Sequence, residues 1–440
     1  MKTIRIEEDV PVIAEADVCV LGGSCTGVFA AVRAARLGAR VALVEKQGHF
    51  GGVAPVTCTW HSLRDTAHRQ SIVAGLTREV LERLGRRGAL ETVQGNEARG
   101  YVFRPGDLKI VLDGLVLENR IAPHLHTLFT RPVVENGRLA GVVVESKSGR
   151  GVLRARAFVD ATGDGDLCAR LGVPTYAYEA PLPPTTCAFL DRWPDDGAPD
   201  VGALVRQHGA DHGLESGFVW GTLLPGTDVY MLAGTRVRHA DCAHAGDLTR
   251  AEIEGRRQVG AILDLIRARR PDSKVALHDF PCTIGIRDTR HVRCRYTLTG
   301  EDVLEGRRFP DAVANGSYRV DIHHQDKPGI TFLHLDGRTF YCQPGLPAEQ
   351  GRWREPRPAD PTFYQVPLRS LMPAGHDNLF AAGRMLDADI TAFSAVRVMV
   401  NTNQTGEAAG VAAFCALDSG AAADPARVRR LLADGGSLVL

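Results

Sequence analysis

The stretch Asp17-Val-Cys-Val-Leu-Gly-Gly-Ser-Cys-Thr-Gly27, with the residues that follow as far as Glu45, decides the fold of this chain. The apolar run 18–21 predicts a buried parallel strand, and the glycine-rich turn after it predicts backbone amides that approach a phosphate at the start of a helix. A second apolar run, 41–44, ends in Glu45, whose carboxylate can accept hydrogen bonds from ribose hydroxyls. This order of elements predicts a βαβ unit that binds a dinucleotide.

The glycine spacing departs from the usual pattern at one position. In the strict GxGxxG register the three positions are Gly22, Ser24 and Gly27, and serine is the next smallest side chain that still permits close approach. A glycine-rich loop alone is weak evidence, but here a strand precedes it, a helix follows, and an acid stands about 20 residues further on. The pair Gly51-Gly52 lies where flavoproteins wrap the chain back over the pyrophosphate, which favours FAD over NAD.

Composition excludes several classes of protein. The 440 residues are 44% hydrophobic, enough for two or three domains or subdomains with a substantial core. The 52 basic and 52 acidic residues give a formal charge of zero, so no overall field would draw the protein to nucleic acid or to an anionic membrane. No run reaches the roughly 18 apolar residues of a membrane helix, and the first 16 residues carry Lys and Glu. We therefore expect a cytoplasmic protein without nucleic-acid or membrane partners.

The ten cysteines are scattered, with neither a Cys-x-x-Cys pair nor a zinc-like His and Cys spacing. In a cytosolic chain most of them are expected to be small buried side chains, and no metal site is predicted.

Periodicity divides the chain into three parts. Helical spacing predicts helices over 71–87 and 107–120, and strand spacing then predicts strands over 127–130, 132–134, 139–145 and 152–157, with a hairpin at Glu135-Asn-Gly137. One more strand, from Ala157 to Asp160, leads to Ala161-Thr-Gly163. Residues 174–360 are rich in Pro, His and Arg, with strand-like runs at 218–223 and 229–232 and a helix over 249–269. The chain ends with a helix over 398–417.

We therefore predict an α/β fold, in which a Rossmann-like FAD-binding domain with a parallel sheet carries an inserted β-rich (α+β) substrate domain. The FAD-binding domain would comprise residues 1–173 and 361–440, and the substrate domain residues 174–360. No second glycine fingerprint follows a strand in the inserted part, so no NAD domain is predicted.

Four separated blocks resemble the FAD-dependent oxidoreductases of the glutathione reductase superfamily, more narrowly the bacterial group known simply as FAD-dependent oxidoreductases. The resemblance covers nearly the whole chain. The blocks are Leu21–Gly27 with Glu45 and Gly51-Gly52; Val159-Asp-Ala-Thr-Gly-Asp-Gly-Asp166; Gly285-Ile-Arg287 through Tyr296-Thr-Leu298 and Asp321-Ile-His323; and Val366–Leu371 through Gly383-Arg384 and Arg397-Val-Met399.

The resemblance implies where the cofactor lies. Ala161–Gly163 should run along FAD, Gly383-Arg384 should approach its ribityl and pyrophosphate portion, and the helix after Met399 should aim its N-terminus at the isoalloxazine. The positive end of a helix dipole would stabilise the negative charge of a reduced flavin. The predicted cofactor-binding residues are Gly22, Gly23, Ser24, Cys25, Thr26, Gly27, Glu45, Lys46, Gly51, Gly52, Val53, Val133, Ala161, Thr162, Gly163, Gly383, Arg384, Val398 and Met399.

Four residues are candidates for catalysis. By the resemblance, Arg397 lies near the flavin or a substrate anion, and His61 enters the region of the flavin ring. His323 could act as a general base oriented by the neighbouring acid Asp321, since imidazole titrates near neutral pH. Arg287 could hold a substrate oxygen. Each of the four could instead be structural, as a packed or hydrogen-bonded side chain.

The chain also departs from its relatives. Cys58 is the one cysteine shortly after the glycine pair, where disulfide reductases carry Cys-x4-Cys, so a dithiol relay is not expected, although Cys58 could contact substrate or tether the flavin. Flavin monooxygenases usually have Gly-Asp where this chain has Gly383-Arg384, but Asp164-Gly165 with Arg170 is similar to another of their motifs.

The expected function is an FAD-dependent oxidoreductase of the dehydrogenase or oxidase type. It would abstract a hydride from a small polar organic substrate, such as a sugar or hydroxy acid, and pass the electrons to oxygen, a quinone or another carrier. The alternatives are an NAD(P)H-dependent flavin monooxygenase or reductase and, in another class, an FAD-holding module that assists a partner. Homo-oligomerisation stays open.

Overall fold

The computed structural model describes residues 3–93, 100–194, 198–215, 219–343, 346–419 and 422–440. Its centre is a five-stranded sheet in which all neighbours pair in parallel. The strands are, in spatial order, β24 (Leu379–Ala381), β11 (Ala157–Asp160), β2 (Val18–Leu21), β3 (Val41–Val44) and β7 (Ala122–His124). The predicted strand, helix and strand of the βαβ unit are confirmed.

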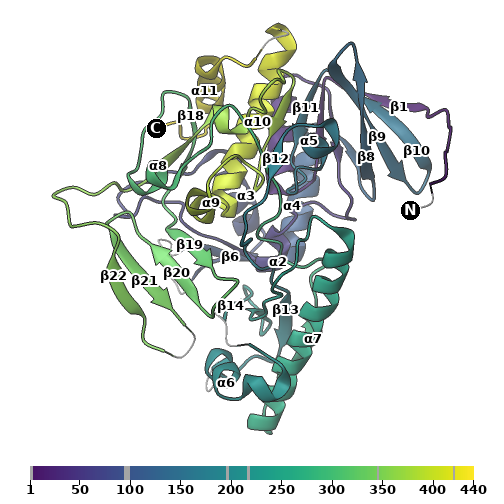
Figure 1. The fold of residues 1–440 in the computed structure, drawn as a ribbon. Coiled ribbons are helices and arrows are strands. Elements are labelled where there is room, and N and C mark those ends of the chain that lie inside the picture. Colours follow the sequence, from purple (N-terminus) through teal and green to yellow (C-terminus); the bar gives the residue numbers. More distant parts are fainter. Residues whose placement is uncertain (1–2, 94–99, 195–197, 216–218, 344–345, 420–421) are drawn as a thin grey trace.

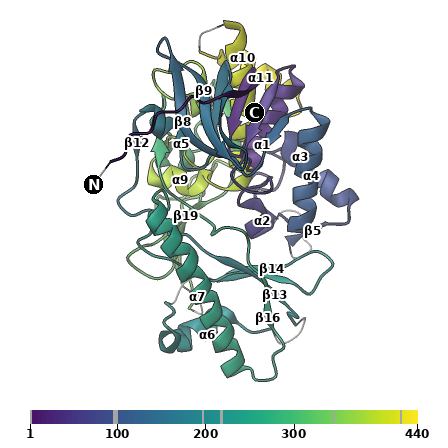
Figure 2. The same cartoon turned by 90° about the vertical axis from the view of Figure 1, so that its right-hand side faces the viewer.

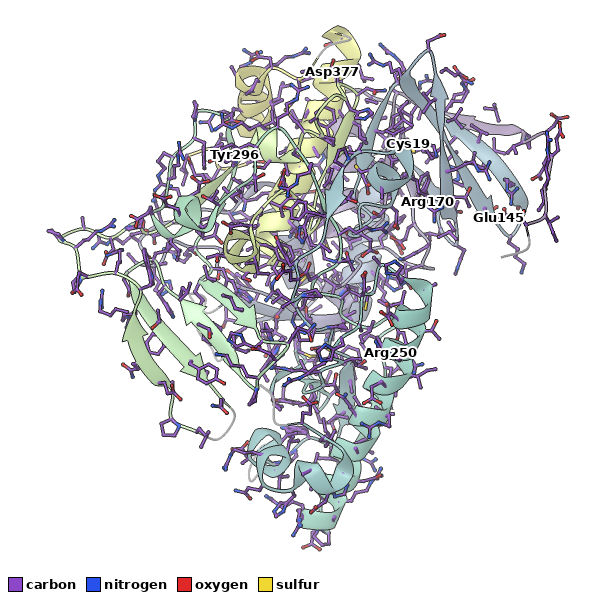
Figure 3. All side chains as sticks on the ribbon, in the orientation of Figure 1. Cys19, Glu145, Arg170, Arg250, Tyr296 and Asp377 are labelled. Atoms are coloured by element: carbon purple, nitrogen blue, oxygen red, sulfur yellow. The ribbon has the colours of Figure 1, made fainter. Side chains whose placement is uncertain are left out.

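Two different layers cover this sheet (Figures 1 and 2). On one face Val18 and Val20 pack against helices, whereas on the other Cys19 and Leu21 pack against an antiparallel meander, because side chains alternate along a strand. The helical layer contains α1 (Cys25–Arg36), α3 (Gly75–Arg86), α4 (Pro105–Glu118), α10 (Met399–Ser419) and α11 (Pro425–Asp434). The meander contains β8 (Leu128–Glu135), β9 (Arg138–Ser146) and β10 (Gly149–Arg154), next to α5 (Asp166–Leu171), and β1 (Val12–Glu15) extends its sheet by pairing with β10 in parallel. Figure 3 shows Cys19 inside the molecule and Glu145 on the outlying meander.

Helices α1 and α10 touch at their backbones. A Cβ atom on Gly406 or Gly410 would lie 2.1 Å from the carbonyl oxygen of Thr26 or Ala30, so only glycine fits at these two positions of α10. Arg33 of α1 also forms a buried ion pair with Glu407 of α10. These contacts fix the position of α10 relative to the glycine-rich turn.

The middle of the chain adds the β-rich part. One four-stranded antiparallel sheet, with α6 and α7 beside it, lies at the end of the molecule away from α10 (Figure 2), and a second lies at its side (Figure 1). The first contains β14 (Trp220–Leu223), β15 (Tyr230–Ala233), β13 (Cys187–Asp191) and β16 (Ala276–Asp279), and its helices are α6 (Val201–His208) and α7 (Ala245–Arg269). The second contains β19 (Val320–His323), β20 (Ile330–Leu333), β21 (Arg338–Cys342) and β22 (Glu349–Arg352).

Smaller elements connect these parts. A three-stranded sheet has the order β4-β6-β5, and two pairs are β12-β17 and β18-β23. Their bounds are β4 (Thr59–Trp60), β5 (Leu90–Thr92), β6 (Tyr101–Phe103), β12 (Thr175–Tyr176), β17 (His291–Val292), β18 (Ala312–Gly316) and β23 (Tyr364–Pro367), and the short helices are α2 (Ala54–Thr57), α8 (Gly300–Leu304) and α9 (Ile390–Val396), with 3₁₀ turns at Gly209–His212 and Leu368–Leu371.

The predicted elements differ from the observed ones mainly at their ends. The helices expected over 71–87, 107–120, 249–269 and 398–417 are α3, α4, α7 and α10, and the strands expected over 127–130 and 132–134 are one strand, β8, whose register shifts twice. Of the strand-like run 218–223, residue 218 lies outside the described residues. Leu298, Phe309 and Ala314 pack in the same core as β2 and α1, so part of the middle segment joins the nucleotide-binding layers. The proposed domain boundaries stay a prediction.

Within the described ranges no helix is both long and apolar enough to cross a membrane. The same residues contain no group of three His, Cys, Asp or Glu side chains placed to hold a metal ion. All ten cysteines are free thiols, and seven of them are buried, which confirms that most are packing residues.

Candidate functional site

A cavity of about 1210 Å³ opens at the carboxyl ends of β2, β3, β11 and β24. It is larger than the roughly 300–1,000 Å³ of pockets that hold drug-sized ligands. Parallel sheets bind ligands outside the carboxyl ends of their strands, since the turns into the helices open there. The opposite walls come from the strands of the two antiparallel sheets.

The glycine-rich turn forms one wall of the cavity. Its backbone packs so closely against neighbouring residues that its glycines cannot be replaced by residues with side chains. Gly22 has φ +99°, and a Cβ there would lie 2.2 Å from the carbonyl oxygen of Ala161. A Cβ on Gly27 would lie 1.8 Å from the carbonyl oxygen of Gly22, and one on Gly52 would lie 2.5 Å from the Cβ of Ser24. Ser24 is the residue before α1, so the turn delivers the amides at the helix N-terminus to the cavity, as an anion such as a pyrophosphate requires.

Glu45 follows β3 at the edge of this turn and is buried. Its carboxylate accepts hydrogen bonds from the amides of Gly23 at 2.6 Å and Gln47 at 2.7 Å. A carboxylate has about four acceptor sites. Glu45 can therefore still accept bonds from a ribose while the two amides hold it in place.

The loop after β11 meets the loop after β24 on the next side of the cavity. Arg384 forms an ion pair with Asp164, whose carboxylate also accepts a 2.9 Å hydrogen bond from the Thr289 hydroxyl. The Nε of Arg384 is buried and has no hydrogen-bond partner among the described residues. Gly163 has φ +82°, and a Cβ there would lie 2.7 Å from Arg384 Nη1. The two loops are thus packed tightly and leave one donor of Arg384 unsatisfied.

The N-terminus of α10 opens onto the same cavity, as predicted. Val398, Met399, Thr402 and Asn403 line it, and the 21-residue helix behind them directs its positive end there. Helix α9 (Ile390–Val396) comes before α10, with Asp389 as its N-cap and Arg397 as its C-cap residue. The side chain of Arg397 lines the cavity.

Most predicted cofactor residues come together at this cavity. Those that line it are Gly22, Ser24, Cys25, Thr26, Glu45, Lys46, Gly51, Gly52, Val53, Ala161, Thr162, Gly163, Gly383, Arg384, Val398 and Met399. Gly23 and Gly27 lie just behind the lining, where they allow the turn to close. Val133 lies on β8 in the outlying meander and outside the described lining, so nothing in its position supports a role in binding.

A buried carboxylate, Asp321 of β19, organises the other half of the cavity. It accepts hydrogen bonds from Arg397 Nη2 at 3.0 Å and from the Tyr318 hydroxyl at 3.0 Å, and its Oδ1 lies 3.2 Å from His323 Nε2. Burial acts to raise the pKa of Asp321, but His323, Arg397 and Arg287 together hold that pKa below its usual value. Asp321 is therefore ionised.

His323 is less suited to be a base than the sequence suggested. Its Nε2 faces Asp321, and its Nδ1 lies 3.4 Å from Nη2 of Arg236, which can only donate. Both ring nitrogens therefore face protein groups, although the contact of Nε2 with Asp321 is electrostatic, since Asp321 Oδ1 has no hydrogen-bond partner among the described residues. Burial, with Arg287 and Arg397, lowers the pKa of His323 to about 3 despite Asp321, so the ring is neutral.

His61 is placed differently. It lines the cavity directly after β4, and its ring lies 4.8 Å from that of Tyr318, centroid to centroid. Its Nδ1 is 3.1 Å from Ser62 Oγ, while no hydrogen-bond partner of Nε2 occurs among the described residues. Burial, Arg319 and Arg397 lower the pKa of His61 to about 4. At neutral pH this side chain is an uncharged imidazole with a lone pair to offer.

Arg287 lines the cavity beside β13 and donates to the carbonyl oxygen of Pro183 at 2.6 Å and to the Thr185 hydroxyl. Burial, together with the charges of Arg397 and Arg236, lowers the pKa of Arg287 to about 9. A guanidinium in this position remains charged at neutral pH and would favour an anion nearby.

Sequence reasoning missed several residues of this half. Tyr318 and Arg319 lie just before β19, His334 lies just after β20, and all three line the cavity. An aromatic wall was also missed, in which the rings of Trp193 and Tyr230 stack at 4.0 Å. The strand period around 229–232 could have indicated that Tyr230 points to one face of a sheet, but no motif marks the other residues.

Cys58 is a packing residue, as expected for most of the cysteines, and the alternative that it contacts substrate or flavin has no support in its position. Cys58 is fully buried between Val56 and Val102, and its Sγ lies 3.4 Å from the carbonyl oxygen of Pro55. Its neighbours Thr57 and Thr59 line the cavity, whereas Cys58 turns away with φ +57°. Burial raises the pKa of the thiol well above its ordinary value, so Cys58 is an inert packing residue.

Comparison with known proteins identifies a family and structures of similar fold. A family model described as FAD dependent oxidoreductase matches residues 17–433. No curated protein matches. Among solved structures, a geranylgeranyl bacteriochlorophyll reductase-like protein from Thermoplasma acidophilum is 11% identical, with 95% of this chain and 82% of that chain covered and a TM-score of 0.48. The flavin-dependent brominase Bmp2 is 11% identical, with 96% and 84% covered and a TM-score of 0.49.

Proposed function

Because the chain belongs to the family of FAD-dependent oxidoreductases, we propose that it oxidises a small polar organic molecule in the cavity and passes the electrons to oxygen, a quinone or another carrier. The narrower placement in the glutathione reductase superfamily is part of this proposal.

FAD is the cofactor of the family, and the cavity suits it. Gly22 and Gly52 allow the chain to fold tightly around Ser24, the residue before α1, where a pyrophosphate would meet the helix N-terminus, and Glu45 offers a buried carboxylate to a ribose. The unsatisfied Nε of Arg384 is a further donor at this end of the cavity. These residues would hold the cofactor, and the N-terminus of α10 would face its ring.

When bound, FAD supplies the two-electron acceptor for a substrate hydride. The side chains of the chain must then bind the substrate, take up its proton and keep it in position. The half of the cavity around Asp321 offers groups for each of these tasks.

The observation that carries the proposal is the free nitrogen of His61. In the tautomer whose Nδ1–H donates to Ser62 Oγ, the Nε2 lone pair faces the cavity without a partner among the described residues. A substrate hydroxyl that donates to Nε2 would lose its proton to this nitrogen as its carbon loses a hydride, which leaves a carbonyl group. His61 is thus the proposed proton acceptor.

The groups around Asp321 would hold the remaining geometry. The Tyr318 ring lies against that of His61 at an interplanar angle of 36°, and its hydroxyl donates to Asp321, so it would limit rotation of the imidazole. Arg397 is fixed by the same carboxylate and lies between β19 and the N-terminus of α10. A negative charge that develops on substrate oxygen would be stabilised by such a preorganised guanidinium.

The test is anaerobic reduction of the purified holoprotein, followed by its flavin absorbance. We expect the flavin band to bleach with members of a panel of hydroxy acids and sugars and to stay with NADH and NADPH alone. In His61→Gln the bleaching rate should fall by about 10²–10⁴-fold, while His278→Gln, a change on the exposed strand β16, serves as the matched control.

Other outcomes would point to the alternatives. Bleaching by NADH or NADPH, with oxygen uptake that depends on them, would indicate a monooxygenase or reductase. A flavin that no organic compound or nicotinamide reduces would indicate a module that holds FAD for a partner. An unchanged rate in His61→Gln would remove that residue from the proposal.

A further inference from the structure

The substrate half of the cavity holds more positive charge than its own carboxylate balances. Arg287, Arg319 and Arg397 line this half of the cavity together with Asp321, and Arg236 lies behind the lining, where the charges of Asp321 and Glu215 act on it. Arg397 is the one that pairs with Asp321. Within the described ranges, neither Arg236, Arg287 nor Arg319 forms an ion pair with any carboxylate. Since charged groups are rarely left unpaired when they are removed from water, the excess indicates a missing anion.

Arg319 is the clearest unpaired group. Its guanidinium carbon lies 3.8 Å from the ring centroid of Phe332 and 5.8 Å from that of Tyr318. Its Nε is buried and has no hydrogen-bond partner among the described residues. An aromatic ring covers the face of a guanidinium but leaves its edge of N–H groups free, and that edge matches the two oxygens of a carboxylate.

Arg287 presents a second free edge to the same cavity. In the described chain its hydrogen bonds use Nη1 alone, toward Pro183 and Thr185. The bonds anchor the side chain on the β13 side, while Arg319 is anchored on the β20 side by Phe332. The two arginines therefore approach the cavity from its two antiparallel sheets.

The neutral histidines do not change this balance. His61, His323 and His334 line the same half of the cavity. Burial lowers the pKa of His61 and of His334 to about 4 and that of His323 to about 3. Of the other carboxylates that line the cavity, Asp164 pairs with Arg384, Glu45 accepts from two backbone amides, and Glu91 accepts from the Gly226 amide. The phosphates of the cofactor would be met at the glycine-rich turn, so they do not supply the missing charge.

We propose that the substrate is a small carboxylate anion whose carboxylate is bound by Arg319 and Arg287. The proposal rests on the function proposed above and narrows its substrate from polar molecules in general to organic acids. Arg397, held by Asp321, completes the positive end of the cavity. A hydroxyl elsewhere on the acid would then be left for His61.

The experiment is equilibrium binding to the oxidised holoprotein, followed by flavin difference spectra and tryptophan fluorescence. The probes are acetate, lactate, malate and benzoate, each compared with its uncharged amide. We expect at least one acid to bind tenfold or more tightly than its amide. Arg319→Met and Arg287→Met should each weaken that acid by about 10- to 100-fold, as for a lost hydrogen bond to a charged group, and leave the amide unchanged.

Arg308→Met is the matched control, since Arg308 stacks on Phe363 at 3.3 Å, as Arg319 does on Phe332, but lies outside the cavity lining. It should bind the acids as the wild type does. If Arg319→Met fails to retain flavin, Arg319→Lys keeps the charge without the planar edge, and it should bind the acid with intermediate affinity.

Three results would each overturn the inference: amides that bind as tightly as acids, arginine variants that bind the acids as tightly as the wild type does, or no binding by any acid. Failure of the proposed function looks different. If acids bind but none bleaches the flavin, the carboxylate site stands and the proposed hydride transfer is wrong. If neutral sugars bleach the flavin and no acid binds, the hydride transfer stands and the carboxylate site is wrong.

Discussion

Arg397 Nη2 donates to Asp321 Oδ2 at 3.0 Å, and this ion pair joins the end of α9 to strand β19 across the cavity wall. Both side chains are almost completely buried, at 12% and 9% exposure. The pair thus links the segment that leads into α10 to the sheet whose side chains we propose to bind the substrate. Its removal should affect stability and binding in opposite directions.

For Asp321→Asn we expect a loss of about 3–5 kcal/mol in the free energy of unfolding, because the buried Arg397 charge loses its partner. The same change increases the positive charge of the cavity, so the variant that remains folded should bind small carboxylates more tightly. Urea unfolding of the holoprotein measures the first effect, and the flavin difference spectrum measures the second. If the variant is as stable as the wild type, solvent rather than Asp321 stabilises the positive charge of Arg397.

The close contact of α1 and α10 gives a prediction far from the chemistry. Gly410→Ala places a methyl group 2.1 Å from the carbonyl oxygen of Ala30, so the helices must move apart. We expect a loss of about 1–3 kcal/mol and weaker flavin retention, since α10 carries its N-terminus into the cavity. Gly260→Ala on α7 is the control, because nothing lies within 4 Å of its added methyl. It should stabilise the protein by up to about 1 kcal/mol.

Glu45 should contribute directly to FAD retention. In Glu45→Ala the cofactor would lose a buried acceptor, and the amides of Gly23 and Gln47 would lose theirs. We expect the dissociation constant of FAD to rise by about 10- to 100-fold. Equilibrium dialysis of the flavin measures this, with Glu45→Gln as the partner variant that keeps one acceptor oxygen. Equal FAD affinity in wild type and Glu45→Ala would contradict the ribose assignment.

The nucleotide-binding half was predictable because its information is local. The strand, turn, helix and acid between residues 17 and 45 are close in sequence, and the turn geometry at Gly22 follows from sterics. The substrate half depends on residues far apart in the chain. Tyr318 reaches His61 across 257 positions, and no local pattern encodes that contact.

The same reason explains the revision at His323. The sequence shows the acid two positions before this histidine, so it predicts an oriented base. It does not show that Arg236, which is 87 positions earlier, occupies the second ring nitrogen. The motif therefore marks a strand that lines the cavity, but it does not show that both ring nitrogens of His323 face protein groups.

The depressed pKa of His61 predicts a specific pH dependence of stability. An unfolded histidine titrates near 6.5, whereas burial and the cations Arg319 and Arg397 lower the folded-state pKa of His61 to about 4. Asp321 opposes this shift, and Ser62 and the Tyr318 ring complete the surroundings. Between pH 4 and 6.5 His61 binds a proton in the unfolded state but not in the folded state. The free energy of unfolding therefore rises as pH rises across this window and falls as pH falls through it.

Urea unfolding at several pH values between 4 and 7 measures this effect. In His61→Gln the number of protons taken up on unfolding should fall by about one, and the exposed His278→Gln should behave as the wild type does. His323 and His334 act in the same direction, because their pKa values are lowered to about 3 and 4, so a residual slope is expected in the variant. An identical slope in His61→Gln and wild type would mean that His61 is protonated in the folded protein, and it would also remove its lone pair from the reaction.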